Sequence, residues 1–141
     1  MGKSDPYVFD LYNQILPKKL FQNVAFLGFS KPNAFTKSIQ AVEKDFYDME
    51  LENWDINSDK WDIEKKYDLV VSTRCPYFAK NPRMFIEKSI DILETGGYFL
   101  ADWGLGDHWR YENFKVGWVK DGEHESFYKD DNFLWSFVWH R

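Results

Sequence analysis

The sequence predicts an α/β domain with a mostly parallel central sheet, helices on both faces and an antiparallel hairpin at the C-terminal end. Residues 67–104 read as strand, loop, helix, glycine turn and strand, and residues 24–29 form an unbroken apolar strand suited to the sheet centre. Near the C-terminus, Asp121-Gly122 between two short strand-like segments is a strong hairpin signal.

The segment 67–104 predicts two parallel strands joined by one helix. Residues 69–71 are a short apolar run, typical of a strand buried on both faces. Asn81 can cap a helix that has Pro82 in its first turn, and Gly96-Gly97 can end it before a strand over residues 98–101. The apolar stripe of this helix comprises Phe85, Ile86, Ser89, Ile90 and Leu93. Ligands gather at the carboxyl ends of such strands, here residues 72–77 and 102–106.

The N-terminal half predicts two further helices. Ser4 or Asp5 caps the first, which Pro17 closes. Asn33 caps the second, whose inward residues are Phe35, Ile39 and Val42. Residues 46–51 alternate partially and favour a strand.

Between these parts, residues 52–66 are polar and have Trp54, Trp61 and Ile63 as large apolar anchors, which indicates an ordered loop. At the C-terminal end, the predicted hairpin joins residues 114–119 to 123–128, and a last strand follows over residues 133–139.

Composition narrows the class of protein. A chain of 141 residues is expected to form one domain, residues 1–141, and its single cysteine excludes an internal disulfide. The net charge of -5 argues against a general nucleic-acid binder. We expect a cytoplasmic protein with no membrane association, since no apolar run has membrane-spanning length and the N-terminus lacks a signal-peptide pattern. The 20% aromatic content indicates either a core of large side chains or an aromatic-lined pocket for a planar ring or a sugar face.

The order YDLVVS, NP, amphipathic helix and IL-x-x-GGYF-x-x-DW resembles the second half of class I S-adenosylmethionine (SAM)-dependent methyltransferases. The resemblance implies a Rossmann-like three-layer sandwich ending in an antiparallel hairpin, with SAM as cofactor. The chain is shortened relative to that family, because 40 positions separate Gly28 from Asp68 where the family fits two strands and two or three helices.

The resemblance implies that the turn LGFSKPN, residues 27–33, holds the methionine and ribose parts of SAM. Gly28 matches the first glycine of the family's motif, whereas Ser30 and Pro32 replace the other two and Phe26 stands in the acidic position. The cofactor contacts expected here come from Leu27, Gly28, Phe29, Ser30 and Asn33. The alternative is a tight strand-to-helix turn that binds no ligand.

Acidic residues after the second strand would then bind the ribose hydroxyls, and Asp48, Glu50 and Glu52 lie near the right place. Asp55 is the candidate for the adenine amine, with Trp54 or Trp61 stacking on the ring. The alternative is that these are ordinary surface acids.

The loops after the strands of residues 67–104 would face the methyl group and its acceptor. Ser72 is expected beside the cofactor, Arg74 could bind an anionic group of the substrate, and Tyr77 could orient or deprotonate a hydroxyl. Cys75 has no histidine near it in sequence, which favours a structural thiol.

The loop after residue 101 carries Asp102, Asp107 and His108, which resemble an acid/base set. His124 is a further candidate. No recognised ligand spacing joins Asp107, His108 and His124, so no metal site is expected.

The function expected from this reading is methyl transfer from SAM to a hydroxyl of a small, sugar-like metabolite. Asp102 or His108 would act as the base, and Arg74 or Tyr77 would position the acceptor. Two alternatives stay open: a methyltransferase-like binding or assembly module without catalysis, and a domain that binds a nucleotide or nucleotide sugar.

Overall fold

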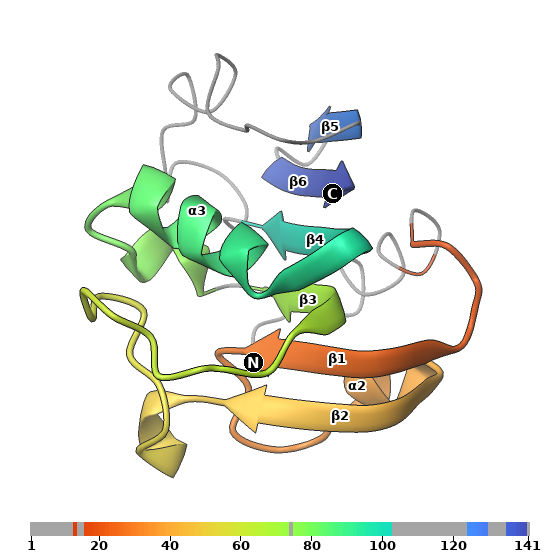
Figure 1. The fold of residues 1–141 in the computed structure, drawn as a ribbon, viewed down its shortest axis with the longest axis horizontal. Coiled ribbons are helices and arrows are strands. Elements are labelled where there is room, and N and C mark those ends of the chain that lie inside the picture. The colour runs from red at the N-terminus through yellow and green to blue at the C-terminus, as the bar shows by residue number, and fades with distance from the viewer. Residues whose placement is uncertain (1–12, 14–15, 74, 103–123, 130–134, 141) are drawn as a thin grey trace.

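The computed structural model describes residues 13, 16–73, 75–102, 124–129 and 135–140. They form a six-stranded sheet with the order β2-β1-β3-β4-β6-β5 (Figure 1). The strands are β1 (Phe21–Leu27), β2 (Ala41–Tyr47), β3 (Tyr67–Ser72), β4 (Leu93–Asp102), β5 (His124–Lys129) and β6 (Trp135–His140). Strands β1 to β4 run parallel, β6 pairs antiparallel with β4, and β5 pairs antiparallel with β6. The prediction of a mostly parallel α/β sheet is confirmed.

Helices cover both faces of the parallel part of the sheet. In Figure 1, α3 (Pro82–Asp91) lies in front of it and α2 (Ala34–Ser38) lies behind. The alternation of strand side chains divides the core accordingly: Val24 and Phe26 of β1 join the α2 cluster, while Ala25 and Leu27 join the α3 cluster. All four of these side chains are fully buried, as expected of a strand buried on both faces.

Helix α3 begins as the sequence predicts. The Asn81 side chain accepts a hydrogen bond from the Met84 N–H at 3.1 Å, and Pro82 occupies the first turn. Phe85, Ile86 and Ile90 are buried against the sheet. The βαβ unit formed by β3, α3 and β4 is therefore confirmed.

The glycine pair does not end this helix. Helix α3 ends at Asp91, and Leu93 already belongs to β4. Strand β4 pairs Leu93 with Tyr67 and then Tyr98 with Leu69, so it carries extra residues in an irregularity of the ladder. Gly96 lies within it with φ 87°, a conformation that suits glycine. Gly96 and Gly97 thus shape a bulged strand start, which corrects the prediction of a helix stop.

Helix α2 is shorter than predicted. It ends after Ser38, because Ile39 is extended and leads straight into β2. Phe35 and Ile39 are buried as predicted, but the prediction for Val42 was wrong: it lies in β2 and is 61% exposed. The strand predicted over residues 46–51 was also misplaced, since β2 ends at Tyr47 and Met49–Leu51 form a 3₁₀ turn, η1, capped by Asp48.

All of residues 28–66 are described, and they contain one strand, β2, which agrees with the shortened interval. Residues 52–66 form the predicted ordered loop, with Trp54 and Trp61 buried. Most of the predicted first helix lies outside the described residues, as do residues 114–119 and the Asp121-Gly122 turn. None of the helices in the described parts of the chain is long and apolar enough to cross a membrane.

Candidate functional site

The carboxyl ends of four parallel strands meet at one edge of the sheet, which we call the carboxyl edge. Leu27 at the end of β1 pairs with Tyr47 of β2 and with Ser72 of β3, and Ser72 pairs with Ala101 of β4. The chain passes from β1 to β2 on one side and then to β3 on the other side of β1 (Figure 1). Such a reversal of strand order is where open α/β sheets bind ligands.

The turn after β1 is closed by the protein's own contacts. Gly28 has φ 89°, and its N–H donates to the Tyr47 carbonyl at 2.7 Å. A Cβ added at Gly28 would lie 2.7 Å from Cys75 Cβ and 2.8 Å from Cys75 Sγ. The Ser72 hydroxyl donates to the Leu27 carbonyl at 3.0 Å. Cys75 therefore fills the space beside Gly28. The Gly28 N–H and the Ser72 hydroxyl already donate hydrogen bonds to carbonyl groups of the protein.

The rest of the turn is divided between core and surface. Phe29 is buried and its ring lies 5.6 Å from that of Phe26. Asn33 forms a capping box with Thr36, accepting from the Thr36 N–H at 2.8 Å and donating its own N–H to Thr36 Oγ1 at 2.9 Å. Ser30 is half-buried and Pro32 is exposed. Among the expected cofactor residues of this turn, Ser30 and Asn33 carry the polar side chains, and both residues are half-buried.

Asp48 follows β2 at the carboxyl edge. It is half-buried, and its Oδ2 accepts from the Glu50 N–H at 2.9 Å. Among the described residues this is the hydrogen bond its side chain makes, so Oδ1 can accept from a ligand. Glu50 itself is exposed.

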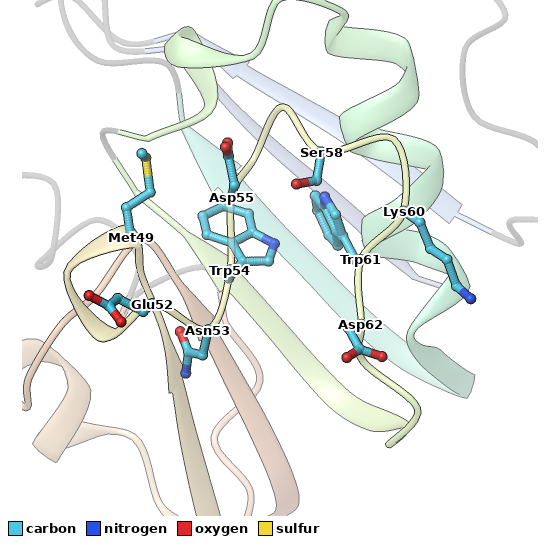
Figure 2. Close-up of a pocket in the computed structure, with 9 residues that line it drawn as sticks. All are labelled: Met49, Glu52, Asn53, Trp54, Asp55, Ser58, Lys60, Trp61 and Asp62. Atoms are coloured by element: carbon cyan, nitrogen blue, oxygen red, sulfur yellow. The ribbon is translucent and has the colours of Figure 1, made fainter.

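Beyond Asp48, the loop of residues 49–62 borders an open pocket of about 350 Å³. We call it the tryptophan pocket, because Trp54 and Trp61 form its floor (Figure 2). It is lined by Met49, Glu52, Asn53, Trp54, Asp55, Ser58, Lys60, Trp61 and Asp62. Asp55 keeps one carboxylate oxygen bonded to the Asn57 N–H at 2.9 Å. The structure thus places Asp55 and both tryptophans among the lining residues of one pocket, and the predicted role of Asp55 toward an adenine amine stays a prediction.

Hydrogen bonds of Asn53 and Asn57 fix this loop to β2 and to the residues before α3. The Asn53 amide donates to the Phe46 carbonyl and accepts from the Asp48 N–H, both at 2.9 Å. The Asn57 amide donates to the Phe78 carbonyl at 3.1 Å and accepts from the Lys80 N–H at 2.8 Å.

Helix α3 holds the middle of the loop. The Lys88 ammonium donates to the Ser58 carbonyl and lies 5.7 Å from the centre of the Trp61 ring, in cation–π range. The pocket therefore has a preorganised frame.

The two tryptophans of the floor are unusual in one respect. Trp54 and Trp61 are 8% and 9% exposed, and neither indole N–H has a hydrogen-bond partner among the described residues. A buried donor without an acceptor costs about 1–3 kcal/mol. Their ring centres lie 5.2 Å apart at an interplanar angle of 74°. Both indole nitrogens are buried from solvent, and an acceptor that reached either one would relieve this cost.

A hydroxyl network that sequence patterns did not reveal joins β2 to β3 across β1. The Tyr67 hydroxyl donates to Asp45 Oδ2 at 2.7 Å and lies 2.5 Å from the Tyr47 hydroxyl. Lys65 pairs with Asp45 at 2.9 Å and with Glu43 at 2.6 Å. No spacing or motif in the sequence singles out these residues, although Ala25, on the strand between, lies in the same buried cluster as Tyr67.

This network perturbs its members' pKa values. Burial, with hydrogen bonds to Tyr47 and Asp45, raises the pKa of Tyr67 far above its usual value. Hydrogen bonds to Glu43 and Asp45 raise the pKa of Lys65. Burial works to raise the pKa of Asp45, but hydrogen bonds from Lys65 and Tyr67 outweigh it and hold that pKa below its ordinary value. The network therefore stabilises the fold with Asp45 ionised and Tyr67 protonated.

The expected catalytic residues are placed only in part. Tyr77 lies in the 3₁₀ turn η2 (Pro76–Phe78) directly after β3, and Asp102 is the last residue of β4, so both backbones lie at the carboxyl edge. Arg74, Asp107 and His108 lie outside the described residues, and His124 opens β5. Among described side chains, no group of three His, Cys, Asp or Glu residues could hold a metal ion.

Comparisons with known proteins give a consistent picture of the fold. No family model matches the chain, and no curated protein matches it. Among solved structures, the N-methyltransferase NodS from Bradyrhizobium japonicum WM9 is similar, with 13% identity and a TM-score of 0.61 over 99% of both chains. NodS in complex with S-adenosyl-L-homocysteine gives a TM-score of 0.69 at 13% identity, over 99% of this chain and 89% of that one.

The DszA carbon methyltransferase is also similar, with 12% identity, a TM-score of 0.52 and coverage of 98% of this chain and 52% of that one. At these identities the likeness is one of fold. The chain has the Rossmann-like α/β fold of SAM-dependent methyltransferases, which confirms at the level of fold the resemblance read from residues 67–104.

Proposed function

We propose that this protein binds SAM along the carboxyl edge and transfers its methyl group to a hydroxyl of a small metabolite. The single observation that carries the proposal is the reversal of strand order beside β1, with Asp48 at the end of the neighbouring strand. In sheets of this kind a ligand crosses the strand ends at such a reversal. The fold shared with NodS, which has been crystallised with the demethylated cofactor, supports the same reading.

The nucleoside end of SAM fits the residues at this edge. Asp48 Oδ1 would accept from a ribose hydroxyl, with the exposed Glu50 as the second acidic candidate. The Ser30 hydroxyl and the backbone of Phe29 would face the methionine part. Cys75 beside Gly28 narrows that end, so the methionine part would pass over Ser30 instead of pressing against Gly28.

When bound, SAM would supply a methyl group carried by a sulfonium, whose thioether is a good leaving group. The protein's main task is therefore to hold the acceptor close to the methyl group, in line with the breaking bond and away from water. An acceptor hydroxyl also has to lose its proton. We propose Asp102 or His108 as the base, and Arg74 or Tyr77 as the group that positions the acceptor.

A second function, a methyltransferase-like binding or assembly module without catalysis, is favoured by one specific observation. The Gly28 position, where the family lets its ligand approach the backbone, is closed by Cys75, and Ser30 and Pro32 replace the glycines that follow. In this alternative Gly28 serves packing alone.

Ligand-dependent thermal unfolding separates these functions. A rise in Tm with SAM and with S-adenosylhomocysteine, together with transfer of a labelled methyl group to hydroxylated acceptors, would support the enzyme. A rise with both ligands but no transfer would support the module. A rise with nucleotide sugars alone would overturn the SAM proposal.

A further inference from the structure

We propose that the tryptophan pocket binds an uncharged saccharide ring. The binding does not rest on the proposed methyl transfer, because the residues that line the pocket include none of those proposed to hold the acceptor or to act as the base. The pocket's volume of about 350 Å³ lies at the lower end of the range of roughly 300–1,000 Å³ for small-molecule sites. It therefore suits one or two small rings.

The polar groups of the pocket need both kinds of hydrogen-bonding partner. The indole N–H groups of Trp54 and Trp61 need acceptors, since they have none among the described residues. The carboxylates of Glu52, Asp55 and Asp62, which are among the lining residues, accept hydrogen bonds and so call for donors. A hydroxyl group is both donor and acceptor, and a saccharide carries several around one ring.

The arrangement of the two indoles favours a puckered ring over a flat base. Two parallel aromatic rings can hold a planar base between them, whereas the Trp54 and Trp61 rings meet at 74°. Figure 2 shows the five-membered edge of Trp54 turned toward Trp61. One ring face and one ring edge can therefore support the apolar C–H surface of a sugar, but they cannot sandwich a base.

The charge of the pocket selects against anionic ligands. The lining residues include three acidic side chains, Glu52, Asp55 and Asp62, and one basic side chain, Lys60. A phosphate or carboxylate on the ligand would meet like charge at close range, which disfavours binding. Neutral sugars should bind, and sugar phosphates should be rejected.

The frame of the pocket is fixed before a ligand arrives. Asn53 ties the first part of the loop to β2, and in its middle Asn57 is tied to the residues before α3 and the Ser58 carbonyl to Lys88. A rigid site loses little conformational entropy when it binds, so a small ligand can bind without ordering the loop.

A titration of the full chain with methyl glucoside tests the proposal, followed by NMR of the indole N–H signals and by saturation transfer to the sugar. We expect saturable shifts of the Trp54 and Trp61 signals, and affinity for a glucose phosphate about tenfold weaker or more. Replacing both rim carboxylates, in Glu52→Gln/Asp62→Asn, should weaken methyl glucoside binding by about tenfold or more. Asp59→Asn is the matched control, because Asp59 is exposed in the same loop but does not line the pocket.

The outcomes are separable from those of the proposed function. Trp54→Phe and Trp61→Phe assign the signals, and if they fail to fold, the rim variants still decide the result because their side chains are exposed. Equal affinity in the rim and control variants would overturn the proposal. Shifts with adenosine but not with methyl glucoside would also overturn it and would assign the pocket to a nucleoside. Absence of SAM binding, measured separately, would leave a positive sugar titration standing.

Discussion

Replacing Gly28 by alanine tests whether this glycine is required by the protein's own packing. The new Cβ would sit at φ 89° and 2.7 Å from Cys75 Cβ. The backbone strain of an L-residue there is about 1–2 kcal/mol, and the overlap adds about 1–3 kcal/mol. We therefore expect Gly28→Ala to lower the free energy of unfolding by about 2–5 kcal/mol in total.

Substitutions of Cys75 separate the backbone strain from the steric overlap. Cys75→Gly removes both atoms that the new Cβ would meet, so Gly28→Ala should cost only the strain, about 1–2 kcal/mol, in that background. Cys75→Ala keeps the Cβ at 2.7 Å and should relieve little. The cost is measured by urea unfolding as a double-mutant cycle. An equal cost in all three backgrounds would refute the packing explanation.

Three further perturbations test the network and the helix cap. Tyr67→Phe should lower the free energy of unfolding by about 1–2 kcal/mol, because Asp45 and Tyr47 lose a buried partner; unchanged urea unfolding would show that the network contributes nothing. The depressed pKa of Asp45 means that its stabilisation is complete above the ordinary carboxyl pKa of 3.8 and is lost as the pH falls below it through the folded pKa. The free energy of unfolding should therefore fall less steeply below about pH 4 in Asp45→Asn than in the wild type. An identical pH dependence in both proteins would contradict the depressed pKa of Asp45. Asn81→Ala removes the cap on Met84 and should cost about 1 kcal/mol, and thermal unfolding with no drop in Tm would argue against the cap.

The sequence predicted best the features that local chemistry decides. Asn81 and Pro82 start α3 because capping and proline geometry need only near neighbours. The apolar run of residues 69–71 lies in β3 because a strand buried on both faces has few alternatives. The helix start and the buried strand together were enough to predict the βαβ unit, and therefore the edge at which its strands end.

Features decided by distant contacts could not be read in advance. The pair Gly96-Gly97 is compatible both with the end of a helix and with a bulged strand. The pairing of β4 with β3 decides in favour of the bulge. The use of Gly28 depends on Cys75, far away in sequence, and the Tyr67 hydroxyl reaches Asp45 across β1. The tryptophan pocket was foreseen only as an aromatic-lined possibility, because the loop's ties to α3 set its shape.

The proposed function requires the carboxyl edge to bind SAM through Asp48. Calorimetric titration of the full chain with SAM measures this most directly, with Asp48→Asn as the variant and Asp59→Asn as the matched surface control. We predict micromolar binding in the wild type and the control, weakened about tenfold or more in Asp48→Asn through loss of a charge-assisted hydrogen bond. No heat of binding at millimolar SAM, or equal affinity in all three proteins, would contradict it.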